Sequence, residues 1–376
     1  MGALLFMLSV SATSCQDMAI HHYNSGLTAW EAGDTSLAME HFRKSIEERR
    51  TDPDAHINLG CVLYAKGRYQ EALEEFKFAL SEYENDPGLH YNLGETYAAL
   101  ELYQSAKREY EFVLRLEPEF VDALVSYGKL LLDTGKYKAA QERLIHAMTL
   151  RPSNGKAYIY LGLLYARLGK YHEGANYLYR GLRYEPKNVD GLLGLAYTFY
   201  MREMYDDALK NYQKLYSADP TNSEAMLGIG KTHLEMGKLS QAEDMLNRVI
   251  KIRNDFPEAY KALGDTHAEQ RQYVQAVSNY RMAVHQQEDF PEAYLAMAKV
   301  LHSTGQEIEA KEALDKALLR RPDDPRILYQ IGQFYYNLRN KEQAKNYLER
   351  SLENVSEDLE LRALVERALS ALESSN

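Results

Sequence analysis

Small residues recur along this chain every 34 residues, and no insertion interrupts the interval. One column contains only glycine or alanine: Gly26, Gly60, Gly94, Gly128, Gly162, Ala196, Gly230, Gly264, Ala298 and Gly332. A second column of small residues reads Ala38, Ala72, Ala106, Ala140, Gly174, Ala208, Ala242, Ala276, Ala310 and Ala344. All ten prolines lie at or beside the interval boundaries. This pattern is typical of stacked helical hairpins, because each unit must bury its apolar face against its neighbours.

The interval that begins at residue 121 shows how one unit is built. Apolar residues at helical spacing run from Leu124 to Leu132, and Thr134-Gly135-Lys136 then ends the helix. A second helical pattern follows, and it ends near Pro152. We expect two antiparallel helices that come close at the small residues, where a larger side chain would cost about 1–3 kcal/mol.

These columns resemble the tetratricopeptide repeat. The unit that begins at residue 155 carries the family pattern well, in Tyr158, Leu161-Gly162, Tyr165, Gly174, Leu178, Gly181 and Pro186. The resemblance implies an all-α fold, an α-α superhelix or solenoid of ten helix-turn-helix repeats plus a C-terminal capping helix. The expected repeats span residues 19–52, 53–86, 87–120, 121–154, 155–188, 189–222, 223–256, 257–290, 291–324 and 325–358. We expect them to stack without a hinge into one right-handed superhelix of a little over one turn.

Two groups of residues depart from the family pattern. Glu101, Glu203 and Arg271 replace the usual glycine of the turn within a repeat. Pro53, Pro87, Pro257 and Pro291 lie three residues downstream of the usual proline. That shift places proline in the first turn of the next helix, where its missing amide hydrogen does no harm.

The last residues, 359–376, predict an amphipathic helix that caps the final repeat. Its apolar face consists of Leu361, Leu364, Val365, Ala368, Leu369 and Leu372, and its polar face of Arg362, Glu366, Arg367 and Glu373.

The first residues, 1–18, resemble a secretory signal with a bacterial lipobox. A short apolar run ends in Ser11-Ala12-Thr13-Ser14-Cys15, so Cys15 would carry the lipid after cleavage. The run is too short to span a bilayer, and no Lys or Arg precedes it, as a secretory signal requires. The alternative is a frayed or partly buried N-terminal helix. The corresponding locations are a lipid-anchored place in the bacterial cell envelope or the cytoplasm.

Composition and charge exclude several function classes. A net charge of -11 argues against a nucleic-acid groove, which needs clustered Lys and Arg. Two cysteines cannot form a disulfide framework. Gly228-Ile229-Gly230-Lys231-Thr232 lacks the first glycine and the preceding strand of a phosphate-binding loop. We expect no metal, no cofactor and no catalysis, because no set of nucleophile, base and orienting group can be assembled.

In the family that the chain resembles, the first helix of each repeat lines a concave groove. The sixth position of that helix is asparagine in the first three repeats, at Asn24, Asn58 and Asn92. An amide both donates and accepts, so these residues could hold an extended peptide, as the asparagine ladder of O-linked N-acetylglucosamine transferase suggests. The alternative is that asparagine is merely frequent at this position.

Further along the groove, aromatic residues predict an anchor site. Tyr160, Leu193, Tyr197 and Tyr200 form an expected wall beside a recess left by Gly194 and Gly228; simple packing between neighbours is the alternative. Ser126, Lys129, Arg167 and Lys231 complete the predicted partner-binding set. Acidic residues at the second position, such as Asp122, Glu224 and Glu292, are explained either by the helix dipole or by a basic partner.

The sequence therefore predicts a non-catalytic scaffold that holds an extended or helical segment of a protein partner, in a bacterial envelope assembly. The alternative is a subunit that presents substrate to an enzyme or secretion complex, for example a glycosyltransferase, with catalysis on another chain.

Overall fold

The computed structural model describes residues 2–355 and 358–374, with side chains for 17–355 and 358–372. Every regular element in these ranges is a helix. The chain divides into two compact units, Met1–Gly194 and Leu195–Asn376, and the division falls within α11. The single superhelix expected to run through both units stays a prediction.

Each 34-residue interval contains one helix pair, an odd-numbered first helix and an even-numbered second helix. Unit 1 contains α1 (Gly2–Glu31), α2 (Thr35–Glu48), α3 (Pro53–Ala65), α4 (Tyr69–Leu80), α5 (Pro87–Ala99), α6 (Tyr103–Leu116), α7 (Val121–Asp133), α8 (Tyr137–Leu150), α9 (Gly155–Arg167), α10 (Tyr171–Tyr184) and the start of α11 (Val189–Met201). Unit 2 contains the rest of α11, α12 (Tyr205–Ala218), α13 (Ser223–Glu235), α14 (Leu239–Ile252), α15 (Pro257–Glu269), α16 (Tyr273–Gln286), α17 (Pro291–Ser303), α18 (Glu307–Arg320), α19 (Pro325–Asn337), α20 (Lys341–Asn354) and α21 (Leu359–Ser374).

Within each unit the helices pack in two layers. A first helix packs on the second helix of its own repeat, and that second helix packs on the first helix of the next repeat. First helices also contact one another, as α5 contacts α7 in unit 1 and α15 contacts α17 in unit 2. Among the described helices, no second helix makes comparable contact with another second helix. We call the exposed side of the odd-numbered helices the first-helix face.

The glycine column lets a second-helix side chain press against the backbone of the first helix. A Cβ atom built on Gly60 would lie 2.6 Å from Cε1 of Phe76, and one on Gly94 would lie 2.6 Å from Cε1 of Tyr110. In repeat six, where Ala196 occupies this position, the ring of Tyr212 lies against Gly228 of the next repeat. The small residues are therefore required by helix approach, as the sequence predicts.

The turns within repeats adopt left-handed backbone even where glycine is missing. Glu101, Glu203 and Arg271 have φ values of 59°, 58° and 61°. Arg339, which the sequence pattern did not single out, has a φ of 57°. A side chain disfavours this conformation by roughly 1–2 kcal/mol, so the rest of each repeat must impose it.

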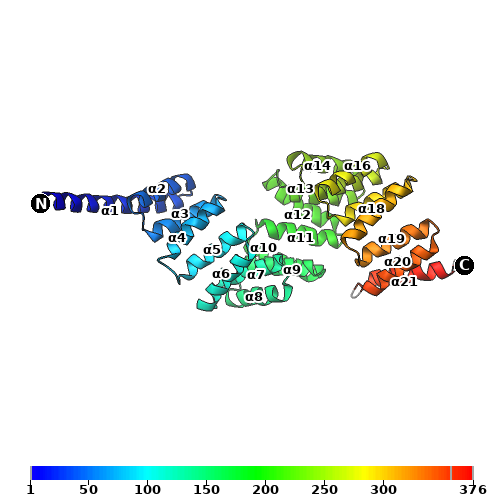
Figure 1. The fold of residues 1–376 in the computed structure, drawn as a ribbon, viewed down its shortest axis with the longest axis horizontal. Coiled ribbons are helices and arrows are strands. Elements are labelled where there is room, and N and C mark those ends of the chain that lie inside the picture. Colours follow the sequence, from blue (N-terminus) through cyan, green and yellow to red (C-terminus); the bar gives the residue numbers. More distant parts are fainter. Residues whose placement is uncertain (1, 356–357, 375–376) are drawn as a thin grey trace. The chain divides into compact units, whose positions relative to one another are not determined.

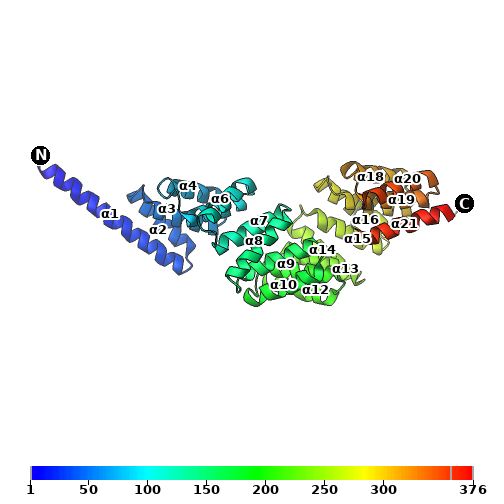
Figure 2. The same ribbon diagram turned by 90° about the horizontal axis from the view of Figure 1, so that it is seen from below.

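At its C-terminal end the array is covered by α21, which lies beside α19 and α20 (Figure 2). Leu361, Val365 and Leu372 are buried in one apolar cluster with Leu348. This confirms the capping helix. Leu364, predicted on the apolar face, is 39% exposed and is not part of that cluster, and the Glu373 side chain lies outside the described side chains.

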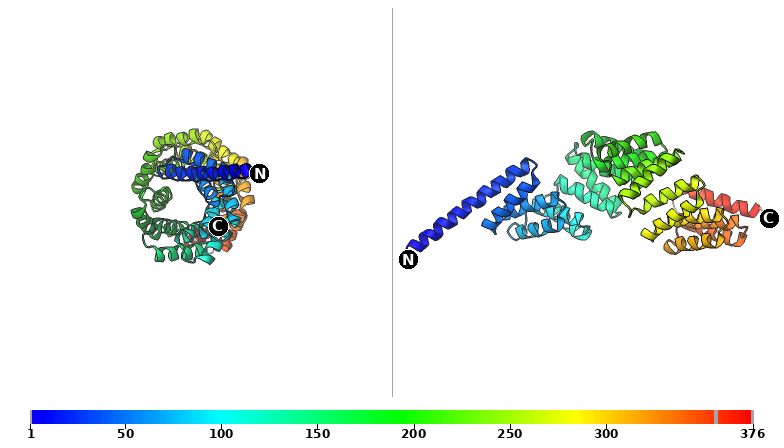
Figure 3. Two further views of the ribbon diagram at one scale, coloured as in Figure 1. Left: turned by 90° about the vertical axis from the view of Figure 1, so that its left-hand side faces the viewer. Right: turned by 90° about the horizontal axis from the view of Figure 1, so that it is seen from above.

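At the other end, α1 extends far beyond its partner α2 (Figures 1 and 3). It runs as one helix of 30 residues, so the predicted signal segment from residue 2 onward and the first helix of repeat one are continuous. The Cys15 side chain lies outside the described side chains. Among the residues described, none of the helices is both long enough and apolar enough to cross a membrane.

Candidate binding sites on the first-helix face

The three asparagines of the predicted ladder have different environments. The side chain of Asn24 is exposed, whereas Asn58 and Asn92 are half-buried. Nδ2 of Asn58 donates to the Tyr23 hydroxyl at 3.1 Å and to the Asp54 carbonyl at 2.9 Å. Nδ2 of Asn92 lies 3.8 Å from Sγ of Cys61. Both amide hydrogens of Asn58 are thus engaged within the chain, which leaves only its oxygen for a peptide.

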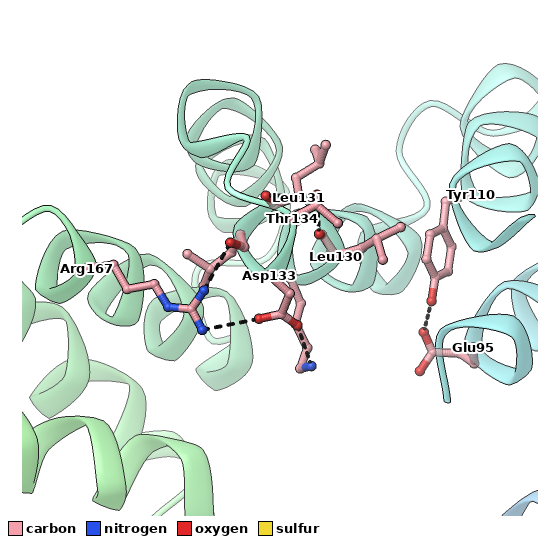
Figure 4. A network of polar contacts seen from close by, with 9 residues as sticks. Glu95, Tyr110, Leu130, Leu131, Asp133, Thr134 and Arg167 are labelled. Carbon is pink, nitrogen blue, oxygen red and sulfur yellow. Dashed lines mark hydrogen bonds and ion pairs between the residues drawn. The ribbon is translucent and has the colours of Figure 1, made fainter. Parts of the chain in front are cut away.

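A charged cluster on α7 and α9 brings together two of the predicted residues around a carboxylate that the prediction missed (Figure 4). Asp133 accepts from Nζ of Lys129 at 3.0 Å and lies 3.6 Å from Nη2 of Arg167. Nη1 of Arg167 also donates to the Leu132 carbonyl at 3.2 Å. The two cations are therefore neutralised in part by Asp133 before any partner arrives. We call these three side chains the Asp133 cluster.

Tyr160 lies next to the Asp133 cluster. Its ring is 6.0 Å from Nζ of Lys129, a distance at which a cation is attracted to an aromatic face. Burial is the main cause that raises the pKa of Tyr160, and the negative charge of Asp190 adds to it. The hydroxyl therefore stays protonated at neutral pH and can donate a hydrogen bond.

Two hydroxyl contacts lie towards the start of unit 1 from this cluster. The Tyr91 hydroxyl lies 3.4 Å from Oγ of Ser126, another predicted binding residue. The Tyr110 hydroxyl donates to Glu95 at 2.5 Å, as Figure 4 shows. On this part of the face, polar side chains are again paired with one another.

In unit 2, the predicted residues Tyr200 and Lys231 lie close together. Nζ of Lys231 lies 5.4 Å from the centre of the Tyr200 ring, and the Tyr200 hydroxyl donates to Glu235 at 3.0 Å. Burial lowers the pKa of Lys231, and the charge of nearby Lys261 lowers it further, against the opposing effect of Asp265. Lys231 forms no ion pair with a described carboxylate. It is a half-buried cation without a direct counter-charge.

A cavity of about 730 Å³ is lined by residues of α13, α15 and α17, together with Leu239 of α14 and Tyr273 and Tyr280 of α16. Its charged lining consists of Glu235, Lys261, Asp265, Glu269 and Lys299. Lys261 pairs with Asp265 at 2.7 Å, and Asp265 also accepts from the Tyr280 hydroxyl at 2.9 Å. Lys299 and Glu269 form no ion pair within the described side chains. We call this cavity the unit 2 pocket, and its volume suits a few side chains of a peptide.

The expected recess at Gly194 and Gly228 is not open. The side chain of Leu163 packs directly against Gly194, and the Tyr212 ring packs directly against Gly228. The two glycines therefore accommodate the chain's own side chains, and this part of the prediction is wrong. Leu193, in unit 1, is half-buried, and Tyr197, in unit 2, is 43% exposed.

Three of the acidic residues at the second position are paired within their repeats. Asp122 lies 3.5 Å from Arg151, Glu224 lies 2.9 Å from Arg253, and Glu292 lies 3.0 Å from Arg321. In each case the arginine follows the second helix of the same repeat. Internal pairing, together with the helix dipole, explains these acids without a basic partner.

Sequence reasoning missed Asp133, Asp265 and Lys299. The columns already contained the signal, because Lys129, Lys231, Asp265 and Lys299 share the ninth position of the first helix. Reading that column for charge would have located the unit 2 pocket. Among the residues described, no group of three His, Cys, Asp or Glu side chains is arranged to hold a metal ion.

Comparisons with known proteins agree on the architecture. Sequence models described as tetratricopeptide repeat match residues 91–142, 159–223, 199–265, 267–328 and 305–368, and one described as TPR repeat matches residues 60–101. A search of the curated proteins finds no match.

Solved structures show the same fold at low sequence identity. The crystal structure of yeast Tom70 has a TM-score of 0.56 and 14% identity, and the match covers 95% of this chain and 96% of that one. The human IFIT1 dimer with PPP-AAAA has a TM-score of 0.57 and 18% identity, with 87% and 88% covered.

Proposed function

Because the chain belongs to the tetratricopeptide repeat family, we propose that it is a non-catalytic scaffold that holds a segment of a protein partner against its first-helix face. The unit 2 pocket is the observation that carries this proposal. Residues of three successive first helices line most of it, and two of its charged side chains, Glu269 and Lys299, are not paired within the described chain.

The charged residues in and near the pocket indicate which kind of segment it would bind. Among the described residues, neither Lys299 of the lining nor Lys231, which lies on α13 outside the lining, forms an ion pair, so an acidic side chain of the segment would gain one there. Glu269 offers a place for a basic group on the same lining. A segment with charges of both signs therefore fits better than a purely apolar one.

Site-specific photo-crosslinking tests this proposal. A photoreactive residue at Ser303, an exposed pocket residue, should capture a partner segment in cells, and Lys299→Glu should reduce the capture. The matched control places the same residue at Val274 on α16, which is 83% exposed but outside the pocket. Equal capture at both positions would contradict binding on the first-helix face.

We also propose that the scaffold is lipid-anchored in a bacterial envelope through Cys15. The support is the apolar run followed by small residues and cysteine. Mass spectrometry of the mature N-terminus should show loss of residues 1–14 and a lipid on Cys15. An intact Met1 with an unmodified Cys15 would leave the cytoplasmic alternative.

A further inference from the structure

A second cavity, of about 700 Å³, lies in unit 1 away from the pairs described on the first-helix face. It is lined by residues of α5, α6, α7 and α8, including three arginines, Arg108, Arg115 and Arg143. We call it the α6–α8 pocket. Phe112, Leu114 and Tyr127 supply its apolar lining.

None of the three arginines forms an ion pair with a described carboxylate. The guanidinium of Arg115 lies 5.4 Å from the centre of the Phe112 ring, and that of Arg143 lies 5.7 Å from the centre of the Tyr127 ring. Arg108 donates only to the Ser105 hydroxyl, at 3.1 Å. All three side chains are exposed, and two of them lie within cation–π distance of an aromatic ring, so their N–H donors are available to a ligand.

The two carboxylates of the lining, in contrast, are already engaged. Glu109 is bound to Nδ1 of His90 at 2.6 Å. Glu111 accepts from the Tyr127 hydroxyl at 2.7 Å and lies 3.7 Å from Nζ of Lys107. The second ring nitrogen of His90 contacts the Glu84 carbonyl at 2.9 Å. The N–H donors left for an anionic ligand are therefore those of the guanidiniums.

We propose that the α6–α8 pocket binds a phosphomonoester. Guanidinium forks match the oxygens of a phosphate dianion and donate to them in pairs. The cavity is larger than phosphate alone needs, so the aromatic and apolar lining receives the group that carries the phosphate. This site is separate from the unit 2 pocket, and it binds whether or not a protein segment occupies the first-helix face.

Phenyl phosphate and inorganic phosphate are the probes. With the full chain at constant ionic strength, isothermal titration should show saturable binding of both, with phenyl phosphate the tighter. Arg115→Gln combined with Arg143→Gln should weaken the binding of phenyl phosphate by about tenfold or more, because the loss of even one charge-assisted hydrogen bond costs roughly tenfold in affinity.

The matched control is Arg180→Gln. Arg180 is an exposed arginine of the same unit whose guanidinium lies 4.8 Å from the centre of the Tyr158 ring, outside the α6–α8 pocket. It should bind phenyl phosphate like the unmodified chain, and circular dichroism should show that all variants are equally helical. The proposal is overturned if the double variant binds as well as the control, or if no probe binding saturates.

Discussion

The first-helix faces of the two units present similar residues in different states. In unit 1, Lys129 and Arg167 share Asp133. In unit 2, Lys231 occupies the same repeat position as Lys129 and likewise lies near an aromatic ring, yet it forms no ion pair among the described residues, and a cavity of about 730 Å³ lies near it. The repeat thus fixes where a side chain stands, whereas the neighbouring repeats decide whether it is still available to a partner.

The contact between a first-helix glycine and a second-helix ring occurs in both units, so the same substitution should destabilise both. Gly94→Ala and Gly264→Ala each place a Cβ atom 2.6 Å from Cε1 of a tyrosine, Tyr110 or Tyr280. Each should lower the free energy of unfolding by about 1–3 kcal/mol, because a packed ring must move. Urea denaturation measures this. If one of the two substitutions left the free energy of unfolding unchanged, this contact would not stabilise both units alike.

Replacing each of the two lysines should change the free energy of unfolding in opposite directions. Lys231→Met should raise the free energy of unfolding by roughly 1 kcal/mol, because it removes a half-buried cation that forms no ion pair among the described residues. Lys129→Met breaks an exposed pair with Asp133 and should lower it by about 0.5 kcal/mol at most. Thermal unfolding of both variants checks this. If both substitutions stabilised the chain, or both destabilised it, the two lysines would not differ as described.

Turn strain offers a control that does not involve the faces. Glu101→Gly in unit 1 and Glu203→Gly in unit 2 should each stabilise the chain by about 0.5–1 kcal/mol, since glycine tolerates their left-handed backbone. Gly67→Ala, at a φ of 74°, should have the opposite effect. Destabilisation by both glycine substitutions would mean that these glutamates contribute more than their backbone costs.

Internal pairing in unit 1 also predicts a pH dependence. Burial alone would lower the pKa of His56, but its hydrogen bonds to Glu75 and to the Arg50 carbonyl outweigh burial and raise it above the ordinary 6.5. The resulting stability is fully present below that ordinary value and is lost as pH rises through the folded-state pKa.

The corresponding variant is His56→Gln. Relative to the unmodified chain it should lose about 0.5 kcal/mol more at about pH 5.5 than at about pH 8.5. Exposed His146, replaced in the same way, is the control. If His56→Gln destabilised the chain equally at both pH values, the His56–Glu75 pair would not cause a pH dependence of stability.

Periodicity alone was enough to predict the helix pairs, the small-residue contacts and the cap, because each depends on one repeat and its neighbour. It could not predict how side chains of different repeats pair. Asn58 was expected to be free for a peptide, but Tyr23 of the preceding repeat accepts one of its hydrogens. Gly228 was expected to open a recess, but the Tyr212 ring of the preceding repeat packs against it. Both outcomes depend on residues in another repeat.

The most direct test of the account compares partner affinity between the two faces. The partner is first identified by crosslinking at Ser303, and its affinity for the chain is then measured. This affinity should fall about tenfold or more in the Lys231→Ala, Lys299→Ala double variant, which removes two charge-assisted contacts. The Lys129→Ala, Arg167→Ala variant should change it by less than about threefold, because those cations already share Asp133. Equal losses in the two variants, or a larger loss from unit 1, would contradict the claim that unit 2 carries the open site.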